Sequence, residues 1–358
     1  MSKRTYAMAE RERVQAVLRR ERPDRVPLWA FFDVKGFAAL YCSRPIADAY
    51  RDPSVSLEMQ RKVCKDMGWV CSPLFGGYFA DFGGKLKLPE GEFSQAPSIT
   101  RYSVESEEDV WKLTVPDMRN LTSVSCEEAF QKLASCQSFD NEPFHGYALI
   151  SSPLDMAGDL CSLENLARWM LKKPEVLHHL LRFTTDFLIE KTKYWREAFG
   201  TKGIILLAAG VRSSNQIISP GQFKQFVLPY QKESHQNALD MGYKHIFCHI
   251  CGEHNLNLLY WAQVPMGDPG IVSIGSEVEL ETAARYFPND VMLGNLEPVI
   301  LQTGTPEEVY EATRKVIEKG KKLGGRYIFS LGCGLPPQTS LDNAKAMNKA
   351  VDDFGWYD

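Results

Sequence analysis

The stretch His245-Ile-Phe-Cys-His-Ile-Cys-Gly252 is almost wholly apolar except for side chains that can bind metal, and it predicts a buried strand. Side chains at positions i and i+2 of a strand leave from the same face. His249 and Cys251 should therefore converge, while Cys248 and Ile250 point the other way. The stretch predicts both a core strand and a pair of metal ligands.

Working outward, similar apolar runs alternate with amphipathic helices from residue 146 onward. Runs that are continuously apolar, rather than alternating, are typical of parallel sheets covered on both faces. Their number predicts a (β/α)8 TIM-like barrel. We expect strands at residues 28–32, 147–150, 203–207, 245–248, 270–274, 290–293 and 327–330.

The sequence also predicts where several helices begin. Ser219-Pro-Gly-Gln222 and Thr305-Pro-Glu-Glu308 each offer a capping hydroxyl, a proline in the first helical position and a Gln or Glu at the capping-box position. A charged helix is expected over residues 9–20. We expect one barrel domain over residues 1–358, with residues 44–140, rich in Pro, Gly and polar residues, forming a loop-rich elaboration within it.

A third possible ligand, Cys333, follows the last apolar run and lies between two glycines, which let the backbone bend closely. One histidine and two thiolates match zinc, and three protein ligands with an open fourth position are typical of catalytic zinc. All three residues fall at strand ends, where a parallel barrel gathers its active site. The alternative is that these residues only pack, since Cys is among the most buried residue types.

The composition limits the functional classes. The 358 residues are 44% hydrophobic and 24% charged, with a net charge of −4 and a pI near 6.0. No basic stripe suggests nucleic-acid binding, no stretch is long enough to cross a membrane, and nine scattered cysteines fit reduced thiols, so we expect a cytoplasmic protein. No GxGxxG or GxxxxGK[ST] motif follows a strand, which argues against dinucleotide and P-loop functions.

Six separated segments stand out along the chain: Arg22-Pro-Asp-Arg-Val-Pro27, Ile218-Ser-Pro-Gly-Gln-Phe223, His249-Ile-Cys-Gly252, Gly294-Asn-Leu-Glu-Pro298, Gly304-Thr-Pro-Glu-Glu-Val309 and Gly332-Cys-Gly-Leu-Pro-Pro-Gln-Thr339. Together they resemble the uroporphyrinogen decarboxylase superfamily, in particular its zinc-dependent, corrinoid-linked methyltransferases such as the coenzyme M methyltransferases. The His-x-Cys pair with a distant Cys is the feature that separates these methyltransferases from the true decarboxylases.

The resemblance implies a TIM-like barrel whose mouth holds Zn²⁺ on His249, Cys251 and Cys333. It also implies a corrinoid co-substrate, carried by a partner corrinoid protein, and a small-molecule methyl donor or thiol acceptor. In such enzymes zinc either activates a thiol that takes the methyl group or assists the departure of a leaving group while cobalt takes it. The sequence does not choose between these directions.

Other residues are candidates for the site. Glu297 is a candidate catalytic residue and fourth zinc ligand, with a helix cap or ion pair as the alternative. Trp29, Phe31 and Tyr78 are candidate substrate-binding aromatics, and Arg212 is a candidate partner for an anionic substrate; core packing and loop polarity are their alternatives. His254 could orient a ligand, but we expect a surface loop position.

Two other functions are compatible with this fold. One is a metal-free decarboxylase like uroporphyrinogen decarboxylase, whose relatives carry an Arg-Gln-Ala-Gly-Arg stretch after the first strand, where this chain has Phe31-Phe-Asp-Val-Lys-Gly36. The other is a non-catalytic partner of a corrinoid protein in which zinc is structural. A second departure from the resemblance is Leu207-Ala-Ala-Gly210, where many relatives carry an acidic residue, so the identity of the acceptor stays open.

Overall fold

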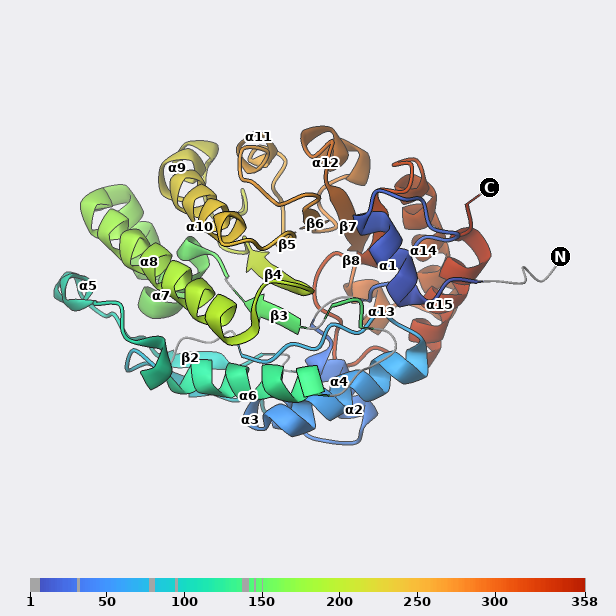
Figure 1. Ribbon diagram of the computed structural model, residues 1–358, viewed down its shortest axis with the longest axis horizontal. Helices are drawn as coiled ribbons and strands as arrows, with labels where there is room; N and C mark the ends of the chain where they lie inside the picture. The colour runs from blue at the N-terminus through green and yellow to red at the C-terminus, as the bar shows by residue number, and fades with distance from the viewer. Residues whose placement is uncertain are drawn as a thin grey trace.

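The main sheet is parallel, and its six strands follow one another in chain order (Figure 1). The computed structural model describes residues 7–30, 33–76, 81–93, 96–136, 142–144, 146–149 and 151–357. The strands of the sheet are β3 Gly146–Leu149, β4 Ile204–Ala209, β5 Ile246–Ile250, β6 Ile271–Ile274, β7 Val291–Leu296 and β8 Tyr327–Leu331. Each lies within about three residues of a strand expected from the sequence.

Two short segments extend this sheet beyond β8. Residues 27–30 run parallel to β8, with the Trp29 N–H donating to the Phe329 carbonyl at 3.0 Å. Residues 69–72 follow, through a hydrogen bond of 3.2 Å from the Val70 N–H to the Leu28 carbonyl. Together with the six strands, these two segments make up the eight strand positions of a barrel, which confirms the predicted fold class.

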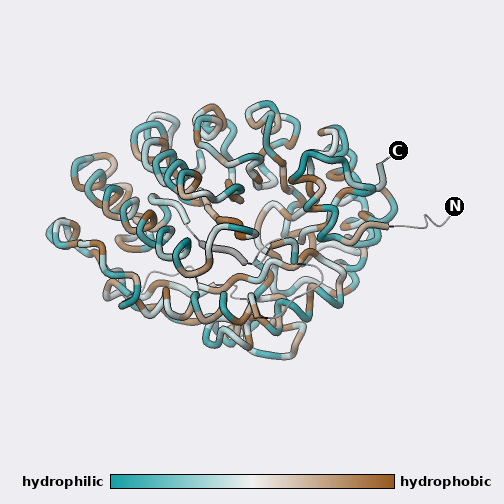
Figure 2. The backbone as a smooth tube through the Cα atoms, in the orientation of Figure 1, coloured by the Kyte–Doolittle hydropathy of each residue, from teal (hydrophilic) through white to brown (hydrophobic). Residues whose placement is uncertain are grey.

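Helices surround the sheet and alternate with its strands (Figure 1). Hydrophilic and hydrophobic residues alternate along them, as expected for helices with one face on a core (Figure 2). None of the helices in the described part of the chain combines the length and apolar character that a membrane span requires. The helices are α1 Glu10–Leu18, α2 Lys35–Tyr41, α3 Asp48–Arg51, α4 Pro53–Met67, α5 Glu107–Lys112, α6 Thr122–Cys136, α7 Pro153–Lys172, α8 Pro174–Phe199, α9 Pro220–Phe226, α10 Leu228–Asp240, α11 Leu258–Trp261, α12 Leu280–Tyr286, α13 Val299–Thr303, α14 Pro306–Lys321 and α15 Leu341–Phe354, with a 3-10 turn at Met118–Asn120.

The two capping boxes expected from the sequence are confirmed. The Ser219 hydroxyl accepts the Gln222 N–H at the start of α9, and the Thr305 hydroxyl accepts the Glu308 N–H at the start of α14. In each helix the side-chain oxygen of the residue at N3, Gln222 or Glu308, in turn accepts a hydrogen bond from the backbone N–H of the cap residue. These local signals were sufficient to place both helix starts.

Alternate residues of the strands β4 to β8 belong to two different cores. The barrel interior contains residues such as Ile205, Phe247, Ile271 and Ile328, whereas their chain neighbours pack against the surrounding helices. Cys248 and Ile250 belong to the outer core, so the predicted division of the β5 side chains between two faces is confirmed. The interior core is apolar at the start of the strands, and polar side chains begin toward their carboxyl ends.

Helix α1 packs against the interior core at the amino ends of the strands, through Val14, Val17 and Leu18. Its Glu10 carboxylate, 6% exposed, accepts hydrogen bonds from Arg13, Arg25 and the Leu28 N–H. This buried ion pair ties α1 to the first barrel segment.

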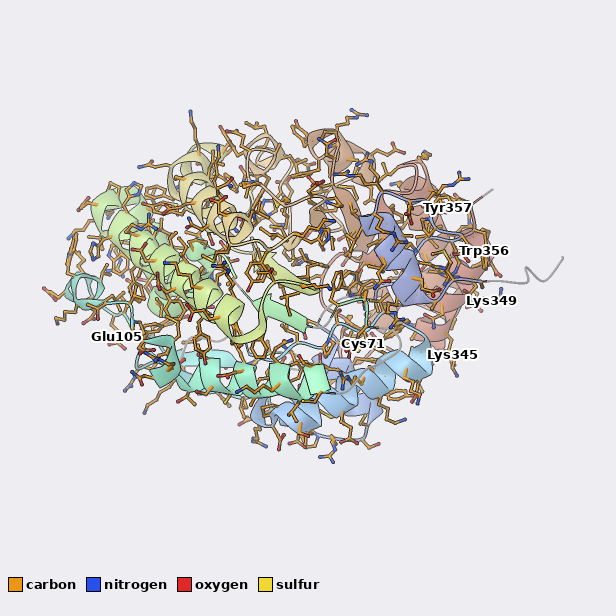
Figure 3. The ribbon with its side chains drawn as sticks, in the orientation of Figure 1. Cys71, Glu105, Lys345, Lys349, Trp356 and Tyr357 are labelled. Atoms are coloured by element: carbon orange, nitrogen blue, oxygen red, sulfur yellow. The ribbon has the colours of Figure 1, made fainter. Side chains whose placement is uncertain are left out.

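The end of the described chain lies beside α1 as well (Figure 3). Arg13 and Arg25 lie over the Trp356 ring, with 5.8 and 5.9 Å between guanidinium carbon and ring centroid. Arg25 and Trp356 also share an antiparallel bridge. Segments from the two ends of the sequence therefore close this side of the barrel together.

Residues 44–140 are more regular than the expected loop-rich elaboration. They contain a short antiparallel hairpin, β1 Lys85–Lys87 with β2 Ser98–Arg101, and two helices of 15 residues each, α4 and α6. Asp52 caps α4 by accepting the N–H groups of Ser54 and Val55, with Pro53 in the first turn. This Asp-Pro start was present in the sequence and outweighs the polar composition around it.

Replacing Glu10 should strongly destabilise the fold. Glu10→Ala would leave two buried guanidinium groups and the Leu28 N–H without their shared acceptor, and we expect the free energy of unfolding to fall by about 3–5 kcal/mol. Chemical denaturation of the variant measures this loss. Glu58→Ala, at an exposed position of α4, is the control and should change stability by less than about 0.5 kcal/mol. Equal stability of both variants would contradict the role given to the ion pair.

Candidate metal centre at the barrel mouth

Three side chains that are distant in sequence meet at the carboxyl ends of the strands. His249 lies in β5, Cys251 directly follows that strand, and Cys333 comes two residues after β8. One possible ligand atom from each lies within 4.8 Å of the other two, and the Cys251 and Cys333 Sγ atoms are 3.5 Å apart. His249 is buried and both cysteines are partly buried. The structure thus brings together the three ligands proposed from the sequence.

Two glycines permit this close approach. A Cβ atom on Gly332 would lie 2.8 Å from the Ser276 backbone nitrogen, and one on Gly275 would lie 2.9 Å from the Gly252 nitrogen. Real Cβ atoms do not come so near to backbone. The absence of side chains at these positions therefore lets the ends of β5, β6 and β8 draw together around the two sulfurs.

The orientation of His249 is set by a neighbouring strand. His249 and Ser273 are direct partners in the β5–β6 ladder, and the His249 Nδ1 atom lies 2.9 Å from the Ser273 hydroxyl oxygen. This contact leaves Nε2 as the ring nitrogen for a metal, and ligating histidines commonly have a partner of this kind on their other nitrogen. Sequence analysis missed Ser273, although a hydroxyl within the apolar run Gly270–Ile274 was a usable signal.

The two thiols perturb one another. A hydrogen bond from the Cys251 thiol lowers the pKa of Cys333 below its ordinary value, and a contact with His249 adds to the effect. The same hydrogen bond, together with burial, raises the pKa of Cys251. The two sulfurs lie 3.5 Å apart, close enough for one cation to bind both as thiolates.

The geometry fits a zinc ion. In tetrahedral coordination with Zn–S bonds of about 2.3 Å, two sulfur ligands lie about 3.8 Å apart. The 3.5 Å between the Cys251 and Cys333 sulfurs is close to this value. One imidazole and two thiolates are ligands that zinc prefers.

Trp29 lies in the apolar floor of the barrel. Its indole is fully buried, meets the Phe247 ring edge-on at 5.3 Å between centroids and donates its N–H to the Ser72 hydroxyl at 2.7 Å. Because Phe247 precedes His249 by two residues on the same face, this floor supports the cluster from below. Phe31 and Tyr78, the other two aromatic candidates, lie outside the described residues, and substrate binding by any of the three stays a prediction.

Arg212 is held by two carboxylates of α7. Its guanidinium donates to Asp159 at 2.5 Å and to the Asp155 carbonyl at 3.0 Å, while the Asp155 side chain accepts the N–H groups of Val211 and Arg212. Burial raises the pKa of Asp159 to about 6, even though Arg212 opposes this shift. Arg212 is partly exposed, and its role toward an anionic substrate stays a prediction. Asp155, which fixes this loop, was not found from the sequence.

Glu297 is exposed and accepts a hydrogen bond from the Ser276 hydroxyl. Within the described part of the chain, the metal-binding group comprises His249, Cys251 and Cys333 without Glu297. That Glu297 is a fourth metal ligand or a catalytic group stays a prediction. Its neighbour Glu277 is also exposed and raises the pKa of Cys251 slightly through its charge.

The surface position expected for His254 was wrong. The side chain is 0% exposed, and burial lowers its pKa to about 4, so that the ring is neutral at physiological pH. It lies between the loop after β4 and the end of β5, within hydrogen-bonding distance of Gly210, Cys251 and Trp261. Trp261 lies seven residues after His254 in the sequence. The two side chains come into contact because the chain turns between them as it enters α11.

Comparison with known families and structures agrees with this architecture. Residues 9–354 match the family model described as Uroporphyrinogen decarboxylase (URO-D). The chain belongs to this family. Its relatives include both decarboxylases and methyltransferases, so family membership does not by itself select a reaction.

Methyltransferases are prominent among the similar proteins. A methylated-thiol–coenzyme M methyltransferase of Methanosarcina mazei is 31% identical over 57% of this chain, and the match spans 52% of that relative, about half its length. A methylcobamide:CoM methyltransferase, MtbA, of Methanosarcina acetivorans is 28% identical over 76% of each chain. A uroporphyrinogen decarboxylase of Xylella fastidiosa is 24% identical over 96% of this chain and 98% of its own.

A solved structure described as a methyltransferase from Methanosarcina mazei shares the fold. It superimposes with a TM-score of 0.81 and covers 97% of this chain and 99% of its own, at 19% identity. The near-complete coverage of both chains shows that the barrel and its surrounding helices have a common arrangement. At this identity the likeness concerns the fold.

Metal analysis tests the ligand assignment. We expect about one zinc per chain in the purified protein, and loss of most of it in Cys251→Ala and Cys333→Ala, because each removes one of three protein ligands. Cys248→Ala is the matched control, because the Cys248 thiol lies in β5 beside His249 but faces the outer core. This variant should keep the metal. Retention of zinc by both ligand variants would refute the assignment.

Ser273 should affect metal affinity without being a ligand. In Ser273→Ala the imidazole of His249 loses its Nδ1 partner, and we expect the zinc dissociation constant to rise by about 10- to 100-fold. Competition with a chelator of known affinity measures the change. An unchanged dissociation constant would show that the barrel walls alone orient the ring.

Proposed function

We propose that this protein is a zinc-dependent methyltransferase that moves a methyl group between a corrinoid and a zinc-activated thiol or small methylated substrate. The observation that carries the proposal is the convergence of His249, Cys251 and Cys333 at the mouth of a barrel of this family. The similarity to methyltransferases whose names specify methylcobamide, coenzyme M and a methylated thiol supports the choice of reaction. We propose that the corrinoid arrives on a partner corrinoid protein.

The ligand set suits this chemistry. Bound zinc would lower the pKa of a coordinated thiol, so that sulfur is present as a nucleophilic thiolate at neutral pH. His249, Cys251 and Cys333 would hold the ion and leave one coordination position for the substrate. The Ser273 hydroxyl would keep the imidazole in the ligating orientation.

The surroundings of the cluster also contribute. The buried floor formed by Trp29 and Phe247 excludes water from below, which would strengthen electrostatic interactions at a bound metal. The opposite side, at the strand ends, carries the partly buried cysteines and the exposed Glu277 and Glu297. Reactants would therefore reach the sulfur atoms from the mouth of the barrel.

The same surroundings disfavour the decarboxylase alternative. A tetrapyrrole substrate bearing several carboxylates needs cationic partners, whereas Glu277 and Glu297 are exposed beside the cluster. The nearby guanidinium of Arg212 is already paired with Asp159. Like charges at the mouth would repel such a substrate.

A spectroscopic assay tests the proposed reaction. The zinc-loaded protein is incubated with methylcobalamin and a panel of thiols that includes 2-mercaptoethanesulfonate, and loss of the methylcobalamin absorption is followed. We expect demethylation with at least one thiol, and a rate lower by about 100-fold or more in Cys333→Ala, because the metal supplies several kcal/mol of stabilisation. Cys248→Ala should react like the parent protein.

The reverse direction requires a second assay, in which cob(I)alamin is offered methoxy, methylamine and methyl halide donors and formation of methylcobalamin is followed. Activity in this assay alone would assign demethylation of a small substrate. Failure of both assays with zinc bound, and an unchanged Co²⁺ spectrum when thiols are added to the cobalt-substituted protein, would favour a structural metal. A protein that binds no zinc but decarboxylates a tetrapyrrole would overturn the proposal.

A further inference from the structure

His254 joins two loops at the barrel mouth. Its Nε2 atom lies 3.0 Å from the Cys251 carbonyl oxygen and 3.2 Å from the Gly210 carbonyl oxygen, and its Nδ1 atom lies 3.1 Å from the Trp261 indole nitrogen. Gly210 follows β4, whereas Cys251 follows β5. One fully buried imidazole thus contacts the ends of two adjacent strands.

These contacts determine where the ring proton lies. The Trp261 indole N–H can only donate, so the His254 Nδ1 atom accepts its hydrogen bond. The proton of the neutral ring must then be on Nε2, which faces two carbonyl oxygens that can only accept. All three contacts are satisfied by this single tautomer.

The carbonyl of Cys251 depends on this arrangement. Within the sheet, the His249 carbonyl accepts the Gly210 N–H at 2.8 Å and the Ile250 carbonyl accepts the Gly275 N–H at 3.1 Å. Cys251 lies just beyond this ladder, and the His254 side chain donates to its carbonyl. The imidazole therefore continues, for one more residue, the hydrogen bonding that fixes the strand carrying both ligands.

The fit around His254 is tight. A Cβ atom on Gly210 would lie 2.4 Å from the Trp261 ring, so the indole packs directly on the backbone of this loop. Asn257, also fully buried, donates its side-chain N–H to the Ser213 carbonyl at 2.9 Å and joins the same two loops. Movement of the Cys251 backbone would have to disturb this whole contact group.

We infer that His254 is a positioning residue of the metal centre, which holds the Cys251 backbone, and through it the Cys251 thiolate, in the geometry that zinc requires. This inference rests on the proposed zinc site and goes beyond it, because His254 is not itself a ligand. It acts through Cys251 in the way that Ser273 acts through His249. The role follows from the Nε2–H donor, so a side chain that presents a donor at the same place should substitute in part.

Two substitutions test the role. His254→Leu removes the donor while filling similar space, and His254→Gln keeps an N–H donor near the position of Nε2. We expect the zinc dissociation constant to rise at least about tenfold in the leucine variant and to recover partly in the glutamine variant. The absorption bands of the Co²⁺-substituted protein, which report the geometry of the thiolate ligands, should shift in the leucine variant.

His235→Leu is the matched control. His235 is also fully buried, contacts Gln231 and the Pro265 carbonyl, and has its pKa lowered to about 4 by burial, but it lies in α10. Its replacement should lower stability without changing zinc affinity or the Co²⁺ spectrum. If His254→Leu does not fold, Trp261→Phe removes the N–H that fixes the tautomer, together with part of the ring that packs on Gly210, and it should raise the dissociation constant by a smaller factor.

The outcomes separate this inference from the metal site itself. A parent protein that binds no zinc or Co²⁺ would refute the proposed site and the inference together. A parent protein that binds zinc, with affinity and Co²⁺ spectrum unchanged in His254→Leu, would refute the inference alone. Equal losses in the leucine and glutamine variants, or an equal spectral shift in His235→Leu, would also overturn it.

Discussion

Parallel hydrogen bonding of β5 with β4 and β6 decides which side chains reach the axis of the barrel. Phe247 belongs to the interior core, Cys248 and Ile250 belong to the outer core, and His249 faces Ser273 across the ladder. A slip of one residue would exchange the two faces. It would bury His249 among the helices and bring Cys248 and Ile250 toward the mouth. The convergence of the candidate metal ligands is therefore a consequence of strand register.

The barrel is divided along its axis into an apolar part and a polar part. Trp29 and Phe247 fill the lower part, and the thiols and imidazole lie above them. Two thiolates and a neutral imidazole would balance the charge of a divalent cation in this setting, which limits the cost of placing an ion near a low-dielectric floor. A further anionic ligand would then meet a centre without net charge, held by protein groups that are already oriented.

Much of the barrel was predictable because local patterns specify it. Continuous apolar runs identified the strands, Ser219 and Thr305 marked two helix starts, and the i, i+2 spacing of His249 and Cys251 gave their common face. The extended segment 69–72 was not predicted from the sequence, because the turn that follows it is fixed by a side chain of a separate helix. The Gln60 side chain of α4 donates a hydrogen bond to the Leu74 carbonyl and accepts one from the Leu74 N–H. The spacing of apolar residues does not predict hydrogen bonds of this kind.

The same distinction applies to the site. The three candidate ligands could be proposed from the sequence because zinc needs particular residue types at strand ends, but the groups that support them depend on contacts between elements. Ser273 matters because of its register with His249, and His254 is buried because the chain turns back through Trp261. Ser and His are common in loops and strands for other reasons, so the residue type alone carries little information. Only the assembled barrel distinguishes them.

Helix α1 has a kinetic consequence under the proposed function. Val14, Val17 and Leu18 pack on the interior core, so within the described part of the chain α1 covers the amino-terminal end of the barrel. Under the proposed function a small thiol and a bulky cobalt macrocycle would both approach the cluster from the mouth of the barrel, and the larger reactant would cover the mouth on arrival. If the reaction methylates a thiol, the thiol would then enter first and its methylated product would leave after the macrocycle, so the order of addition and release would be compulsory.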